Sequence, residues 1–191
     1  MNQPTAPLSE REDAILDAAF LAFAGYGYRR VTMADIAAGA GLSRTALYLH
    51  FRTKEDIFRS LSARYFRTCH AEMDRALRAE GPAEGVLLAA FVAKDGKFME
   101  VVLGTPHGRE LLDAGFALAA EAAVQAEARM AGLLADWLGR QGGGERLGDP
   151  ALAGATLMAA LKGLKTSTRT MADYRAGQVM LARMLALSLG R

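Results

Sequence analysis

The sequence predicts an all-α protein in which a small N-terminal helical module precedes a larger helical domain. Residues of good helix propensity, chiefly Ala, Leu, Arg, Glu and Met, dominate the 191-residue chain. Val and Ile are few, and no stretch alternates apolar and polar residues as a half-buried strand does. The length allows one sizeable core, or a small module joined to a larger one.

The first predicted helix is defined at both ends. Residues 1–9 contain two prolines and several polar groups, and we expect them to form a flexible arm. Ser9 followed by Glu12 has the spacing of an N-cap and its capping-box partner. Gly25 and Gly27 are placed to end the helix, because glycine is favoured just after a helix C-terminus.

Two short helices are predicted next. Thr32 is a suitable N-cap for the first of them, which Gly39 and Gly41 break. Ser43 then caps a third helix that continues through Tyr48. These elements are close together in the sequence, so their connection is a tight turn.

The rest of the chain is predicted to be helical as well. Thr53 caps a long fourth helix over about residues 54–79, and the Glu-Gly-Pro segment at 80–82 closes it, because Gly-Pro stops helices. We place the main domain boundary there. Further helices are predicted at about 83–102, from near 105, at 115–140, at 150–168 and at 172–189, with a loop at 141–150.

Composition limits the classes of function and the compartment. The chain is 51% hydrophobic and 23% charged, which excludes wholesale disorder. Cys69 is its one cysteine, so no intrachain disulfide can form, and a reducing compartment is expected. The N-terminus does not resemble a secretory signal, and no apolar run is long enough to span a membrane. We therefore expect a cytoplasmic location and no membrane partner.

Positive charge is concentrated in one segment. The net charge of the whole chain is only +2. Between residues 29 and 68, however, eight basic residues stand against three acidic ones, a local net charge of +5. A nucleic-acid partner would therefore meet a local basic patch on a chain that is otherwise slightly acidic.

The second and third predicted helices have the spacing of a helix-turn-helix. Ala37 is small enough for two helices to approach closely, and Gly41 supplies a left-handed turn that residues with a Cβ avoid. Leu42 and Leu47 are expected to fill the angle between the helices. In such a motif the start of the second helix enters the major groove of DNA.

The candidate DNA contacts are polar residues on or beside these helices. Arg44 in the leading turn has the geometry to donate two hydrogen bonds to a guanine, and its neighbours at 43 and 45 are within reach of base edges. Tyr48 and His50 lie farther along, where they can donate to phosphate oxygens. Thr32 and Lys54 begin helices whose free N–H groups and dipoles favour phosphate binding. The complete set is Thr32, Ser43, Arg44, Thr45, Tyr48, His50 and Lys54.

Three of these residues also have simpler interpretations. The Tyr48 ring can pack against the first helix, and such packing is compatible with a phosphate contact. His50 can act as a cation at the C-terminus of a helix. Arg44 can be a solvated surface residue, although its position in the motif favours DNA.

The segment 31–58, VTMADIAAGAGLSRTALYLHFRTKEDIF, resembles the N-terminal signature of the TetR family of transcriptional regulators. Ile36-Ala37, Ala40-Gly41, Leu47-Tyr48, His50-Phe51 and Lys54-Glu55 match in register, and the first helix fits as well. The resemblance covers residues 10–60 and is weak beyond them. One departure is Thr45, where many members have Gly or Pro; it leaves the base contacts open.

The resemblance implies a homodimeric regulator without a cofactor or metal. Its domains would be a flexible arm (1–9), a helix-turn-helix DNA-binding domain (10–54), a linking helix (55–80) and an effector-binding and dimerisation domain (81–191). The partners implied are palindromic double-stranded operator DNA, a second copy of the chain and a small-molecule effector. Repressor is favoured over activator only by the habit of the family.

The last two predicted helices are apolar over a wide stripe, which favours burial against something beyond their own domain. We expect them to form a four-helix dimer interface, with an ordinary monomeric core as the alternative. The residues expected in this interface are Leu152, Ala155, Ala159, Gly163, Val179, Met180, Met184 and Leu187.

An effector pocket is expected among the helices at 83–140 and 150–168. Its candidate residues are mostly apolar and indicate an apolar or amphipathic effector, with plain core packing as the alternative for each. They are Phe91, Phe98, Met99, His107, Phe116, Met130, Trp137 and Met158.

Other classes of protein fit less well. The chain has three histidines without metal-ligand spacing, and no nucleophile elbow, P-loop or dinucleotide-binding fingerprint. We therefore predict that it is not an enzyme. A helical protein–protein adaptor would not need the basic excess at 29–68.

Overall fold

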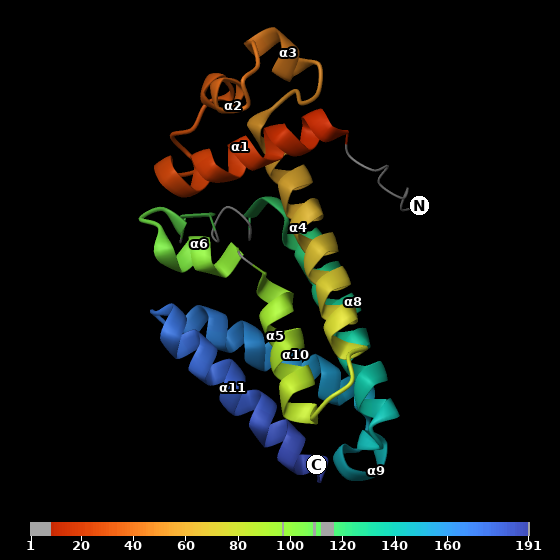
Figure 1. Ribbon diagram of the computed structural model, residues 1–191. Helices are drawn as coiled ribbons and strands as arrows, with labels where there is room; N and C mark the ends of the chain where they lie inside the picture. Colours follow the sequence, from red (N-terminus) through yellow and green to blue (C-terminus); the bar gives the residue numbers. More distant parts are fainter. Residues whose placement is uncertain (1–8, 97, 109, 112–116, 191) are drawn as a thin grey trace. The chain divides into compact units, whose positions relative to one another are not determined.

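The computed structural model describes residues 9–96, 98–108, 110–111 and 117–190, except for the side chains of residues 99, 102 and 103 (Figure 1). Every regular element in this part of the chain is a helix, which confirms the predicted all-α class. The helices are α1 (Glu10–Tyr26), α2 (Met33–Gly39), α3 (Arg44–Tyr48), α4 (Lys54–Leu77), α5 (Ala83–Asp95), α6 (Phe98–Gly104), α8 (Ala120–Arg140), α9 (Gly143–Leu147), α10 (Pro150–Ser167) and α11 (Met171–Ser188).

The chain divides into two compact units. The first consists of residues 1–63 and 105–120, and the second of residues 64–104 and 121–191. Helix α4 contributes its first ten residues to the first unit and the remainder to the second. Among the described residues, no helix combines the length and the apolar character needed to cross a membrane.

Local hydrogen bonds start the N-terminal helices where the sequence predicts. The Ser9 hydroxyl oxygen accepts from the Glu12 N–H at 3.2 Å, and the Glu12 carboxylate accepts from the Ser9 N–H at 2.8 Å. The same exchange links Thr32 with Asp35 at the start of α2. Capping boxes of this kind satisfy N–H groups that have no partner within the helix.

The first unit closes around aromatic rings and aliphatic side chains from α1, α2, α3 and the start of α4. Phe23, Tyr28 and Phe58 pack with ring centroids 5.2–5.9 Å apart. Ile36 and Leu47 are completely buried and hold α2 and α3 to this core. The helix-turn-helix is therefore held in place by apolar contacts on its buried side.

The second unit has a core formed by α5, α8, α10, α11 and the later part of α4. Helix α11 packs against both α5 and α10 (Figure 1). The largest completely buried side chains of this unit include Phe91, Met73 and Tyr174. The predicted helices at 150–168 and 172–189 are confirmed within one residue at each end.

Two expectations for this unit were wrong. The single helix predicted at 83–102 is two helices, because Gly96 follows α5 with φ of 51° and turns the chain. The loop predicted at 141–150 contains helix α9, whose Leu147 packs against the core. The helix predicted to begin at residue 115 is α8, which begins at Ala120, and residues 115–116 lie outside the described part.

The lone cysteine gives a direct probe of this core. Cys69 is 1% exposed, and burial raises the pKa of its thiol to about 12. We expect a disulfide reagent at pH 8 to leave the native chain unmodified and to label it rapidly in urea, because only the thiolate reacts. Absorbance of the released thiol measures this, and rapid labelling of the native chain would contradict the packing of α4.

Candidate nucleic-acid interface

Helix α3 is held by one buried face and presents its other face to solvent. Leu47 is completely buried, whereas Ser43, Arg44 and Thr45 are exposed and Tyr48 is 44% exposed. The turn before α3 depends on Gly41, which has φ of 67°. The exposed residues match the predicted base-contacting set, and an α-helix of this kind fits the major groove.

The two ends of α3 have different environments. The Ser43 hydroxyl oxygen accepts from the Ala46 N–H at 3.1 Å, so this side chain begins the helix as predicted. His50 lies just beyond the C-terminus, is partly buried, and donates its backbone N–H to the Leu47 carbonyl at 3.0 Å. Its ring remains a predicted phosphate contact.

Thr32 already binds an anionic partner within the chain. Its N–H and its hydroxyl donate to one Asp35 carboxylate oxygen at 2.8 and 2.7 Å. These bonds, the backbone one first, hold the pKa of Asp35 below its usual value. A phosphate near Thr32 would therefore meet the other free N–H groups at the start of α2 and would have to lie beside a carboxylate.

The Lys54 side chain is directed inward. Its Nζ donates to the backbone carbonyls of Tyr28, Arg29 and Val31 at 2.8, 3.3 and 2.9 Å, and lies 4.6 Å from the centre of the Tyr28 ring. An ammonium has three donors, so all are used. The side chain thus clamps the loop after α1, and a phosphate contact at Lys54 stays a prediction for the backbone N–H groups at the start of α4.

We expect Lys54→Met to lower stability while leaving the salt dependence of DNA binding unchanged. Hydrogen bonds to a charged group are each worth about 1.5–3 kcal/mol, and the three carbonyls lose their partner together. Urea unfolding should show that the free energy of unfolding falls by at least about 1.5 kcal/mol. The exposed Arg52→Met is the control that should flatten the salt dependence without this loss; a flattened slope for Lys54→Met would return its ammonium to the phosphate contacts.

Three exposed cations near α3 were missing from the predicted contacts. Arg29, Arg30 and Arg52 are exposed and flank the helix-turn-helix in the sequence. The charge excess at 29–68 was the available signal, but charge alone does not show which arginines face solvent. The Arg29 N–H is anchored by the Glu110 carboxylate at 2.8 Å, which fixes the backbone there.

The predicted dimer residues form an exposed apolar stripe on α10 and α11. Leu152, Met180, Met184 and Leu187 are 66%, 55%, 62% and 71% exposed. Ala155, Ala159 and Gly163 are exposed as well, and Val179 is partly buried. Large apolar side chains grouped in this way typically mark an interaction surface.

The predicted effector residues are divided between the two units, and some lie outside the described part of the chain. Four of them share one buried core cluster in the second unit: Phe91, Met130, Trp137 and Met158. Phe98 is partly buried in the same unit, whereas His107 belongs to the first unit and lies 3.8 Å from Glu110. Phe116 and the side chain of Met99 lie outside the described residues. As an effector site, the set stays a prediction.

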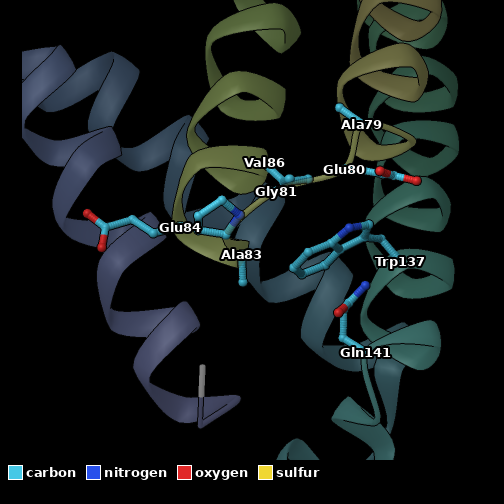
Figure 2. Close-up of a pocket in the computed structure, with 9 residues that line it drawn as sticks. Ala79, Glu80, Gly81, Ala83, Glu84, Val86, Trp137 and Gln141 are labelled. Atoms are coloured by element: carbon cyan, nitrogen blue, oxygen red, sulfur yellow. The ribbon is translucent and has the colours of Figure 1, made fainter.

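A cavity of about 440 Å³ lies beside Trp137 at the α4–α5 connection (Figure 2). Its wall includes Glu80 and Glu84, but Figure 2 shows their side chains pointing away from Trp137 on opposite sides. Glu84 also accepts a hydrogen bond from Arg183 at 3.1 Å. The two carboxylates therefore do not converge on a common ligand position.

Comparison with known proteins identifies relatives of the N-terminal part. The family model "Bacterial regulatory proteins, tetR family" matches residues 15–61. The HTH-type transcriptional repressor KstR2 of Mycolicibacterium smegmatis is 30% identical over 114 residues, 58% of this chain and 55% of that protein. The HTH-type transcriptional repressor BepR of Brucella suis is 41% identical over 64 residues, 34% of this chain and 31% of that protein. The chain thus spans about half or less of these relatives.

The fold of the whole chain also has solved counterparts. A transcriptional regulator from Cytophaga hutchinsonii superposes with a TM-score of 0.69, covering 95% of this chain and 98% of that one. The two sequences are 20% identical, so this likeness concerns the fold alone.

Proposed function

Because residues 15–61 match the model of the tetR family of bacterial regulatory proteins, we propose that the chain belongs to this family and is a homodimeric transcriptional repressor which a small-molecule effector releases from a palindromic operator. The observation that carries the DNA-binding part is the solvent-facing side of α3. Arg44 and Thr45 are exposed there while Leu47 is completely buried, so the base-reading side chains sit on a fixed support. The relatives are repressors, and we expect no catalysis.

The symmetry of the operator follows from the proposed dimer. The exposed apolar stripe on α10 and α11 supports association of two copies, which would present two α3 helices. Two such helices read half-sites about 34–36 Å apart, or a multiple of that distance. A modest change in their separation is then enough to lose the operator.

Helix α4 is the element we propose for coupling effector to DNA. Its first turn carries Lys54, whose ammonium clamps the loop after α1, and its later residues Cys69 and Met73 belong to the core of the second unit. A ligand that moves the later part of α4 therefore acts on the same helix that supports the DNA-binding module. The effector would be apolar or amphipathic.

Selection from random duplex DNA at a fixed salt concentration tests the proposal. Enrichment of a palindrome with two half-sites would support a dimeric sequence-specific regulator. Binding without sequence preference would contradict it. A transcription assay on the enriched site then separates repression from activation.

A further inference from the structure

The second unit contains a buried group of charged side chains that includes none of the predicted DNA contacts. Asp95, the last residue of α5, is 1% exposed, and its Oδ1 accepts from Lys94 at 3.2 Å and from Lys165 of α10 at 3.4 Å. Its Oδ2 accepts from the Tyr174 hydroxyl and, at 3.5 Å, from the Gln178 amide. Four donors on two oxygens saturate this carboxylate.

The two lysine ammonium groups have more hydrogen-bond donors and more charge than the single Asp95 carboxylate can match. Among the described residues each donates one hydrogen bond, and both bonds end on the same Asp95 oxygen. An ammonium has three donors, so most of this donor capacity is unused. Among the side chains that the structure describes, two cations also face one anion, which leaves an excess of one positive charge, since the nearby Arg175 lies 3.6 Å from its own partner Glu100.

The pKa shifts agree with this count. Burial opposes ionisation of Asp95, but Lys94 and Lys165 hold its pKa below the usual value, so the carboxylate stays charged. Burial lowers the pKa of Lys165, and Asp95 offsets this only in part because Lys94 repels the same ammonium. The lowered pKa of Lys165 is therefore consistent with two ammonium groups that share one carboxylate.

One aromatic ring lies beside the Lys165 ammonium, and a second ring packs against the first. The Lys165 ammonium lies 5.6 Å from the centre of the Phe98 ring, and the Phe98 ring lies 4.8 Å from that of Tyr65. The Lys165 side chain is 16% exposed and that of Lys94 is 7% exposed, so Lys165 is the more accessible. A ligand reaching it would place one charged group on Lys165 and an apolar part against the rings.

We propose that this cluster binds the effector through a single carboxylate, and that the effector is an amphipathic carboxylic acid. The carboxylate would accept from Lys165 first and Lys94 second, balancing the one excess charge without displacing Asp95. The proposal rests on effector control as proposed above, and it narrows the effector from an apolar or amphipathic molecule to an amphipathic one with a single negative charge. Charge-assisted hydrogen bonds are the strong ones, so the anionic group should dominate affinity.

Pairs of an acid and its primary amide test the proposal on the full chain, because the two differ mainly in charge. We would titrate hexanoate, decanoate and 1-naphthoate, each against its amide, in a calorimeter without DNA. At least one acid should bind about tenfold more tightly than its amide. If no acid is preferred over its amide, the proposal is overturned.

Matched lysine variants test whether the tighter binding of the acid over its amide arises at this cluster. Lys165→Met should bring the acid and the amide to nearly equal affinity while leaving the amide unchanged. Lys162→Met removes an exposed lysine of the same helix that pairs with Glu127, and it should keep the preference. Lys94→Met is the second variant and should reduce the preference as well; a preference that survives both changes at 94 and 165 overturns the site.

Operator release is measured separately, so the two proposals fail in different ways. An acid that binds with the expected preference but leaves the operator complex intact would support the site and contradict effector control. Operator release by an amide as effectively as by its acid would support effector control and contradict an anionic ligand.

Discussion

The double variant Met180→Arg/Met184→Arg is expected to be a folded monomer that no longer holds the operator. Both methionines lie on the exposed apolar stripe of α11, one helical turn apart, and are 55% and 62% exposed in the single chain. Because they are not part of the core, the substitution should leave the helix content of each chain unchanged, and any fall in melting temperature should reflect only the lost association. The substitution alters only the exposed apolar stripe that we propose to contact the second copy.

The expected effect on association is large. Burying such a side chain contributes about 1.5–3 kcal/mol, and a two-fold dimer contains each of the two residues twice. Because each methionine is only 55–62% exposed, four contacts contribute about 4–7 kcal/mol, or roughly three to five orders of magnitude in the dissociation constant. Light scattering with size-exclusion chromatography at micromolar concentration measures the change, and a gel shift should show loss of the bivalent advantage.

Leu21→Arg is the matched control, because Leu21 is an apolar residue of α1 that is 69% exposed and is not one of the predicted interface residues of α10 and α11. It should leave the dimer intact. If the α11 variant also remained a dimer, the interface would have to lie elsewhere on the chain.

Arg44→Ala is expected to weaken operator binding and to relax the preference at one base pair in each half-site. A bidentate contact to guanine is worth about 1–3 kcal/mol of discrimination, and a dimer makes it twice. Arg44 is exposed at the start of α3, so its loss leaves the packing of Leu47 untouched. Binding titrations on the selected operator, with each position varied in turn, measure the effect.

Arg30→Ala is the control that distinguishes a contact to a base from a contact to a phosphate. Arg30 is exposed in the same basic segment but precedes α2, so we expect a nearly uniform loss on all sequences and a flatter salt dependence. The same uniform loss for Arg44→Ala would show that Arg44 contacts phosphate. Unchanged binding would remove it from the interface.

The sequence determined the elements whose causes are local. The capping exchanges of Ser9 with Glu12 and of Thr32 with Asp35 join residues three positions apart, so their spacing is sufficient to predict them. The turn at Gly41 was equally predictable, because a left-handed φ favours glycine strongly. Burial of Leu47 and exposure of Arg44 follow from the period of a helix that packs on one side.

Tertiary structure decided the features that depend on distant partners. Lys54 looks like a free cation in the sequence, but its ammonium meets carbonyls more than 20 residues away. Lys94 and Asp95 are two adjacent charged residues within the helix predicted at 83–102, yet α11 and α10 bury them with Tyr174 and Lys165. Periodicity reports which face of a helix is apolar; it does not report which polar groups a second helix will cover, because that depends on how the helices pack.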